Sequence, residues 1–330
     1  MKIVTLGEVM LRLSPPANER FVQADTFGAC YGGAEANVAV MLAQLGAKTE
    51  FVTKLPENEL GQAALNSLRR WGVGTEYIVR GDGRLGVYYL ERGASQRAGK
   101  VIYDRAGSAF AVSSAEEYDE SVFEGADWFH FTGITPALGE NCLALVQKAC
   151  RAAKKHGATV SCDINYRATL WPLERAKEAM KKLMADIDVC ISNAFQAEQI
   201  FDLHAQGAGD EHDEALARML AETYGLRAVA LTRRKSVTAN ENFFSGMLWQ
   251  DKAYFSREYD MKIVDRVGGG DAFAGGLIYA LAGKESGQSA IEFATAAGCF
   301  KHSVEGDVCL ACEQEIRALA QGAADGRVSR

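Results

Sequence analysis

The sequence has 330 residues, of which 48% are apolar, 24% are charged and only five are prolines. This composition belongs to an ordered globular chain and excludes a disordered, fibrous or membrane-spanning protein. Acidic residues outnumber basic ones by 43 to 36, and no block of basic residues occurs, so we expect neither nucleic acid nor a membrane surface as a partner.

The N-terminus and the cysteines indicate a cytoplasmic protein. Residues 1–8 carry one basic side chain and a short apolar run that ends in Gly-Glu, which does not match a signal peptide. The eight cysteines are scattered and lie mostly inside apolar runs, as reduced core thiols do. We therefore expect no disulfide framework.

Strand-like and helix-like segments alternate along most of the chain. In chain order, the pattern predicts strand 2–7, helix 36–46, strand 50–55, helix 59–72, strand 128–132, helix 141–156, strand 159–163, helix 173–185, strand 189–192, helices 195–203 and 214–224, strand 228–232, and helices 271–283, 288–303 and 312–320. The last ten residues are expected to form a frayed tail. This alternation predicts one α/β domain over residues 1–330, with a doubly wound, mostly parallel sheet and helices on both faces. Ligands of such sheets bind at the carboxyl ends of the strands.

Two segments interrupt this alternation. Residues 12–31 contain no helical stripe, and residues 86–105 contain two strand-like runs separated by a polar turn, which is a hairpin pattern. We interpret them as a small β lid added to the main sheet.

The strongest motif is the glycine-rich segment Asp265–Gly276. Gly268, Gly269 and Gly270 open a helix, so unobstructed N–H groups lie at the positive end of its dipole, where a phosphate or a phosphoryl group in flight can bind. Asp271 stands beside that site and can accept the proton of an attacking hydroxyl. The alternative is structural, with Asp271 as the helix N-cap and the glycines in a tight turn.

A second glycine turn, Tyr31–Asn37, also enters a helix. Gly33 lets a ligand approach the backbone, and the Asn37 amide can hydrogen-bond a sugar. The equally weighted alternative is a loop followed by an ordinary capped helix.

Other ligand motifs fail when their context is checked. No GxxxxGK[ST] phosphate loop occurs, and the GxGxxG match at 81–86 precedes a strand instead of a helix, which indicates a turn. Cys299, His302, Cys309 and Cys312 are too closely spaced for the common zinc modules. We expect no metal site built from protein ligands alone.

The two glycine motifs together resemble those of the ribokinase-like carbohydrate kinases, over nearly the whole chain. That family has an early Gly-Gly…Asn segment and a late Asp-x-x-Gly-x-Gly-Asp-x-Phe segment, matched here by residues 32–37 and 265–273. The resemblance implies that Gly268, Gly269 and Gly270 form the anion hole and that Asp271 is the catalytic base. It also implies ATP and Mg²⁺ as cofactors.

Three further segments, 103–109, 130–138 and 163–171, are similar to those of 2-keto-3-deoxygluconate kinases within this family. Their substrate carries a carboxylate, and arginine can hold a carboxylate through two parallel hydrogen bonds. The resemblance places near the sugar acid Gly33, Asn37, Tyr88, Tyr103, Arg105, Ile134, Arg167 and Asp307. It places near the nucleotide Asn165, Arg167, Asn193, Thr232, Gly268 and Gly270. The alternative for Arg105 and Arg167 is an ordinary ion pair.

Two positions depart from the family pattern. Gln196 stands where the family often has a glutamate that helps to organise magnesium, and Glu198 is a weak substitute. The nucleotide loop usually reads Thr-x-Gly, whereas residues 232–236 read Thr-Arg-Arg-Lys-Ser. The extra cations can hold nucleotide phosphates or belong to a solvated loop, and the sequence favours the loop.

We therefore expect an ATP-dependent phosphotransferase with an alcohol acceptor that converts 2-keto-3-deoxygluconate into its 6-phosphate. The alternatives are another sugar kinase of this family, such as a fructokinase, and a catalytically silent sugar-binding regulator. Because exposed lid strands need a partner, we also expect a homo-oligomer formed through the lid.

Overall fold

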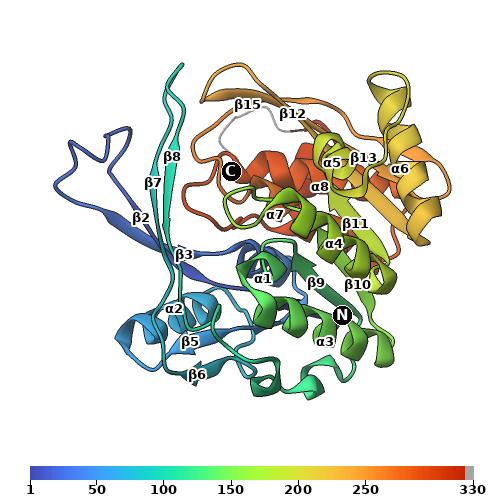
Figure 1. The fold of residues 1–330 in the computed structure, drawn as a ribbon. Helices are drawn as coiled ribbons and strands as arrows, with labels where there is room; N and C mark the ends of the chain where they lie inside the picture. Colours follow the sequence, from blue (N-terminus) through green and yellow to red (C-terminus); the bar gives the residue numbers. More distant parts are fainter. Residues whose placement is uncertain (324–330) are drawn as a thin grey trace.

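A mixed sheet of nine strands organises the computed structural model, which describes residues 1–323 (Figure 1). Its strand order is β14-β13-β12-β11-β10-β9-β1-β4, with β15 also paired to β13. The strands are β1 (Lys2–Leu6), β4 (Lys48–Val52), β9 (Trp128–Thr132), β10 (Thr159–Asp163), β11 (Val189–Ser192), β12 (Ala228–Ser236), β13 (Glu241–Trp249), β14 (Ala253–Phe255) and β15 (Tyr259–Lys262). All pairs from β4 to β12 are parallel, whereas β13, β14 and β15 pair antiparallel. The predicted α/β class with a mostly parallel sheet is confirmed.

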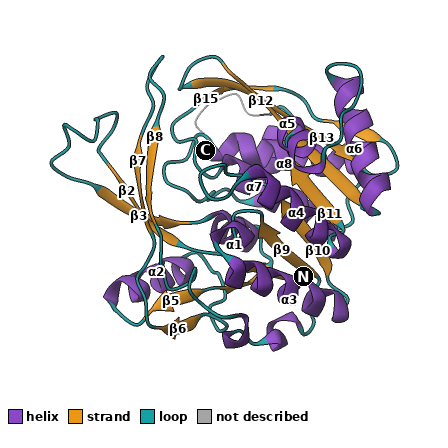
Figure 2. Ribbon diagram, viewed as in Figure 1, coloured by secondary structure: helices purple, strands orange, loops and turns teal. Residues whose placement is uncertain are grey.

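Helices cover both faces of this sheet (Figure 2). They are α1 (Ala34–Gln44), α2 (Glu59–Arg70), α3 (Glu140–Lys155), α4 (Leu173–Leu183), α5 (Ala194–Phe201), α6 (Asp210–Tyr224), α7 (Gly269–Ala282), α8 (Gly287–Lys301) and α9 (Glu313–Ala320). Short 3₁₀ turns occupy Ala115–Glu117, Glu120–Phe123, Pro136–Leu138 and Met184–Asp186.

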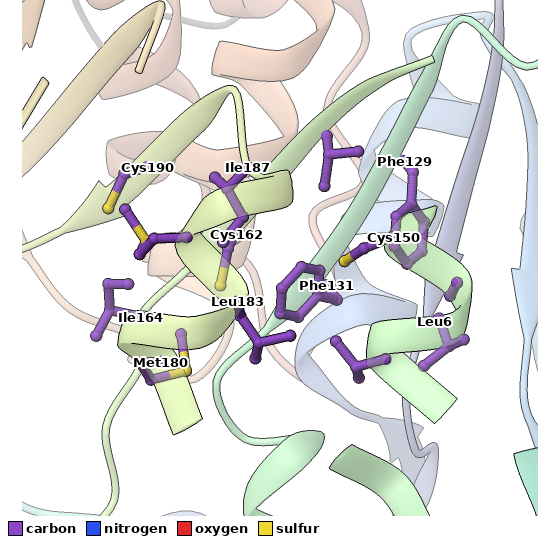
Figure 3. Close-up of a cluster of buried hydrophobic side chains, with 14 of the residues drawn as sticks. Leu6, Phe129, Phe131, Cys150, Cys162, Ile164, Met180, Leu183, Ile187 and Cys190 are labelled. Carbon is purple, nitrogen blue, oxygen red and sulfur yellow. The ribbon is translucent and has the colours of Figure 1, made fainter. Parts of the chain in front are cut away.

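Successive side chains of the buried strands belong alternately to two hydrophobic cores, one on each face of the sheet. Val4 and Phe129 pack with residues of α3 to α6, while their neighbours Ile3 and Trp128 pack with residues of α1, α7 and α8. Successive side chains of a strand point to opposite faces, so apolar strands of this kind need helices on both sides. Figure 3 shows the first core, where Phe131 and Cys162 lie near Leu183 of α4.

Most predicted elements are confirmed with bounds shifted by a few residues, but three differ. The predicted strand 50–55 is two strands, β4 and β5 (Lys54–Pro56), separated at Thr53. Residues 232–236, predicted as a loop, extend β12 and pair with residues 242–246 of β13. Strands β13 to β15 were not predicted from the sequence. Part of the predicted C-terminal tail, residues 324–330, lies outside the described residues.

The two interrupting segments contribute a separate sheet of four strands in the order β3-β2-β7-β8. Its strands are β2 (Met10–Ser14), β3 (Gly28–Gly32), β7 (Val87–Glu91) and β8 (Lys100–Asp104), and we call it the small sheet. Figure 2 shows these strands projecting from the helix-covered body. A further pair, β5 with β6 (Val79–Gly81), lies near α2, whose first turn is capped by the Asn58 side chain.

Two further features of the fold concern the state of the cysteines and the length and polarity of the helices. All eight cysteines fall within the described residues and all are free thiols. Among residues 1–323, no helix combines the length and the apolar character that a membrane span requires.

Candidate active site

A cavity of about 770 Å³ lies where the carboxyl ends of the parallel strands face the small sheet. Its wall includes every residue that the sequence assigned to the base, the anion hole, the sugar or the nucleotide: Gly33, Asn37, Tyr88, Tyr103, Arg105, Ile134, Asn165, Arg167, Asn193, Thr232, Gly268, Gly269, Gly270, Asp271 and Asp307. These residues come from separate elements along the chain. The fold therefore brings the two glycine motifs into one site.

The Asp271 carboxylate of the second glycine motif is held in place by a hydrogen bond from the first glycine motif. Asp271 is the third residue of α7, and its Oδ2 accepts from Asn37 Nδ2 of α1 at 2.7 Å. Asn37 Oδ1 in turn accepts from the Gly33 backbone N–H at 3.3 Å, which orients the amide. The N-cap of α7 is Gly268, and no side chain caps this helix. The alternative of Asp271 as an N-cap is therefore wrong.

Burial raises the pKa of Asp271 to about 7. The hydrogen bond from Asn37 acts in the opposite direction, while the negative charges of Asp163, Glu35 and Asp307 raise this pKa further. A carboxylate with a pKa near the working pH is well suited to take a proton from a hydroxyl.

The three glycines present the N-terminus of α7 to the cavity. Gly268 has a φ of +83°, which favours glycine, and a Cβ there would overlap the Asp307 carbonyl oxygen. A Cβ on Gly269 would overlap the His302 ring, whereas Gly270 faces open space. The first N–H groups of a helix have no intrahelical acceptors, so this end can bind an anion.

The small sheet supplies an aromatic wall of the cavity, made of residues that the resemblance places near the sugar. Tyr88 of β7 and Tyr103 of β8 lie with their ring centroids 5.9 Å apart, and Arg105 lies 5.8 Å from the Tyr103 ring centre. Arg105 also donates from Nε to Glu8 Oε2 at 2.8 Å, and its Nη2 donates to the same oxygen. The ion-pair alternative for Arg105 is thus realised by Glu8, a residue that the sequence analysis missed. Within residues 1–323, Nη1 of Arg105 has no hydrogen-bond partner.

A buried arginine of the small sheet connects this sheet to the start of the glycine motif and to the loop after α8. Arg12 of β2 is only 1% exposed and contacts Asp307 through Nη1 and Asp265 through Nη2, both at 2.6 Å. Its Nε donates to Ser14 at 2.9 Å, and the Tyr88 hydroxyl donates to the other oxygen of Asp307. Burial disfavours the charge on Arg12, but the two carboxylates hold its pKa above the ordinary value. The sequence analysis also missed this residue.

The residues that the resemblance places near the nucleotide lie mostly at the ends of β10, β11 and β12. Asn193 caps α5 by accepting from the Gln196 backbone N–H at 2.9 Å, and Thr232 Oγ1 donates to the Ser192 carbonyl at 3.3 Å. Arg167 is exposed at the cavity wall, and within residues 1–323 its one hydrogen bond is donated by Nη1 to the Tyr166 carbonyl at 3.3 Å. The sequence analysis missed Asp163, which also lines the cavity and whose pKa burial raises to about 7.

The structure shows which contacts are made by the residues that depart from the family pattern. Gln196 Nε2 donates to the Tyr166 carbonyl at 3.3 Å, and Glu198 contacts His212 and does not line the cavity. Arg233 and Arg234 lie on a strand and line the cavity, so the predicted loop is wrong, whereas the expected solvent exposure is found at Arg234, Lys235 and Ser236. No group of His, Cys, Asp or Glu side chains suited to hold a metal occurs within residues 1–323.

The fold and this site are those of a phosphotransferase whose acceptor is an alcohol group. The family model for pfkB family carbohydrate kinases matches residues 1–310, and the chain belongs to that family.

Individual relatives agree with this assignment. The crystal structure of a 2-dehydro-3-deoxygluconokinase from Thermotoga maritima is 46% identical, covers 98% of both chains and superposes with a TM-score of 0.96. A 2-dehydro-3-deoxygalactonokinase from Haloferax volcanii is 31% identical over 97% of both chains. A putative ribokinase II from Escherichia coli in complex with ATP and Mg²⁺ shares the fold, with 19% identity, 97% and 99% coverage and a TM-score of 0.83.

Replacing the base should remove catalysis without removing the fold. We expect Asp271→Asn to lower kcat by about 100-fold or more, the scale of a lost general base. In the wild type, kcat/KM should fall as the pH drops below about 7, because Asp271 becomes protonated. Asn37→Ala removes a hydrogen bond to the carboxylate, so the pKa of Asp271 should rise and this acid limb should move to higher pH.

Asp163→Asn separates the two carboxylates by pH dependence, since the pKa of Asp163 also lies near 7. Asp163 lines the same cavity, so its loss can also lower kcat, and the position of the acid limb is the readout. Removing its negative charge should move the acid limb to lower pH but keep it. A folded Asp271→Asn variant with near-normal turnover would contradict the assignment.

The Arg12 ion pairs should contribute strongly to stability. Arg12→Met leaves two buried carboxylates without a counter-charge, which should lower the free energy of unfolding by about 3–5 kcal/mol in urea denaturation. Adding Asp265→Asn should recover part of this loss. Arg84→Met, which breaks the exposed Arg84–Asp104 pair, should cost little by comparison. Equal losses for the two arginine variants would argue against this role.

Proposed function

We propose that the protein transfers the γ-phosphoryl group of ATP to the terminal hydroxyl of 2-keto-3-deoxygluconate, giving the 6-phosphate. The observation that carries this proposal is that Arg105 and Arg167 line the same cavity as Asp271 and the glycines of the α7 N-terminus. Two guanidinium groups suit an acidic sugar, whereas a neutral sugar has no use for them. The name of the Thermotoga maritima relative supports the same substrate.

The residues divide the reaction among themselves. Asp271 accepts the proton of the attacking hydroxyl, and Asn37 fixes the orientation of its carboxylate. The N–H groups at residues 268–270 stabilise the charge on the phosphoryl group in transfer. Tyr88 and Tyr103, on the small sheet, cover the sugar and help to exclude water, which otherwise competes as the phosphoryl acceptor.

The donor set fits ATP with Mg²⁺. Magnesium prefers oxygen ligands and usually binds through substrate phosphates, waters and one or two carboxylates. Asp163 supplies a carboxylate to this cavity and would hold the ion, which neutralises charge on the phosphates when bound. Gln196 is neutral, and Glu198 is engaged with His212, so neither replaces the family glutamate as a charged ligand.

The C4 epimer, 2-keto-3-deoxygalactonate, is a second candidate substrate because the Haloferax volcanii relative is named for it. ADP release measured across both epimers, fructose and ribose separates these possibilities. We expect the two sugar acids to exceed both neutral sugars in kcat/KM. A preference for fructose or ribose over every sugar acid would refute the proposed substrate class.

We expect Arg105 to bind the carboxylate of the sugar acid through the side of its guanidinium that Glu8 does not contact. Arg105→Ala should weaken sugar-acid binding by about 10- to 150-fold, the range for a charged hydrogen bond. Arg105→Lys should recover little, since a point charge cannot make a two-pronged contact. Binding is measured by calorimetry with the acid and with its neutral analogue.

Glu8→Gln provides the matched control. It removes the counter-charge of Arg105 and keeps the guanidinium, so affinity for the acid should be retained or rise. If Arg105→Ala lowers kcat/KM equally for the acid and the neutral analogue, Arg105 does not read the carboxylate.

We also propose that the small sheet pairs with that of a second copy. Strand β8 is a sheet edge, all five of its residues are exposed, and three of them are the apolar or aromatic Val101, Ile102 and Tyr103 at 44%, 55% and 48% exposure. Such an edge strand favours a partner strand or sheet. Sedimentation equilibrium should give a dimer, and Ile102→Glu should shift it toward monomer. A wild type that stays monomeric at high concentration would contradict this pairing.

A further inference from the structure

Two arginines on the nucleotide side lack carboxylate partners. Arg234 of β12 and Arg266, which follows Asp265 in the glycine motif, both line the cavity together with Gly268–Gly270. Within residues 1–323 neither forms an ion pair, whereas neighbouring Arg233 is paired with Asp210 and Asp213. The pairing leaves Arg233 largely neutralised. Arg234 and Arg266 therefore present uncompensated positive charge to the cavity.

Arg234 is held in a defined position. Its guanidinium lies 5.7 Å from the ring centre of Phe244, and its Nη2 donates to His302 Nε2 at 3.1 Å. His302 Nδ1 lies 2.6 Å from the Gly298 carbonyl, so Nδ1 carries the proton and Nε2 is free to accept. The same ring packs against Gly269. Arg234 is thus connected through His302 to the anion hole.

Arg266 is anchored separately, beside the same glycines. Its Nη2 lies 2.6 Å from the side-chain oxygen of buried Asn242, with that amide in the orientation that satisfies both of its polar groups. The Ser236 hydroxyl lies 3.3 Å from the same nitrogen. The neutral partners hold the guanidinium without cancelling its charge.

The positive charges of Arg234 and Arg266 repel each other. The cavity walls and the charge of Arg266 lower the pKa of Arg234 to about 10, and Arg234 still remains protonated at neutral pH. Like charges held together without a counter-ion cost free energy, and a bound anion would offset that cost. Guanidinium groups match phosphate oxygens in geometry as well as in charge.

We propose that Arg234 and Arg266 form a two-arginine clamp for the polyphosphate chain of the nucleotide, beside the glycines that receive the transferred phosphoryl group. The inference rests on the proposed use of ATP and deepens it, because it assigns phosphate binding to Arg234, where this chain departs from the family pattern, and to Arg266, at an unspecified position of the glycine motif. The clamp supplies positive charge to a cavity in which Gln196, in place of the family glutamate, offers no charged ligand for a metal ion.

The test measures nucleotide binding by calorimetry in the absence of any sugar. Arg234→Met and Arg266→Met should each weaken ADP binding by about 10-fold or more, while AMP binding should change much less. Because lost charge contacts are salt-sensitive, the dependence of ADP affinity on ionic strength should also decrease. If Arg266→Met does not fold, Arg266→Lys takes its place in the test. This variant keeps the positive charge, so it should retain part of the affinity for ADP.

Lys235→Met is the matched control. Lys235 adjoins Arg234 on β12 but lies over Phe243 and does not line the cavity, so the same loss of charge there should leave ADP binding unchanged. The clamp is refuted if Arg234→Met and Arg266→Met bind ADP within about twofold of Lys235→Met, or if they weaken only the sugar acid.

The proposed substrate and the clamp can fail separately. A wild type that binds ADP but phosphorylates no sugar acid overturns the substrate proposal and leaves the clamp testable by the same titrations. A wild type that binds no adenine nucleotide overturns both.

Discussion

The buried contacts of Arg12 with Asp265 and Asp307 connect three parts of the chain that lie far apart in the sequence. Arg12 lies on the small sheet, Asp265 begins the glycine motif, and Asp307 lies in the loop after α8. Each charge is out of contact with water, so loss of one partner leaves the others uncompensated. The aromatic wall and the anion hole are therefore positioned by the same ion pairs, with Tyr88 attached to them through Asp307.

Around this centre, the cavity separates its electrostatic tasks. Asp271, in the first turn of α7, and Asp163, at the end of β10, are half-buried, and loss of solvation in the cavity raises the pKa of each to about 7. Arg105 is partly neutralised by Glu8, which leaves one side of its guanidinium for a ligand. Arg234 and Arg266 line the same cavity and form no ion pair within the described residues. The cavity therefore offers separate regions of charge for the proposed proton acceptor, acidic sugar and polyphosphate.

The sequence predicted the residues whose roles depend on local backbone form. Gly268 and Gly270 could be assigned because an unobstructed helix N-terminus requires small residues next to one another, and Asp271 because it follows them directly. Glu8 and Arg12 could not, since each acquires its role from a partner far along the chain. The alternation of β2 even pointed away from Arg12, because Leu11 and Leu13 are apolar in the sequence, whereas the structure buries Met10, Arg12 and Ser14 more deeply.

By itself, the sequence determined the α/β alternation, the positions of the two glycine motifs and their likeness to carbohydrate kinases, because periodicity and local turns are properties of short segments. Only the tertiary structure decided that Asn37 donates to Asp271, that Arg105 pairs with Glu8, and that Arg234 lies on a cavity-lining strand instead of in a loop. These contacts depend on how distant elements pack, since charge pairing and burial are set by neighbours in space and not by neighbours in sequence.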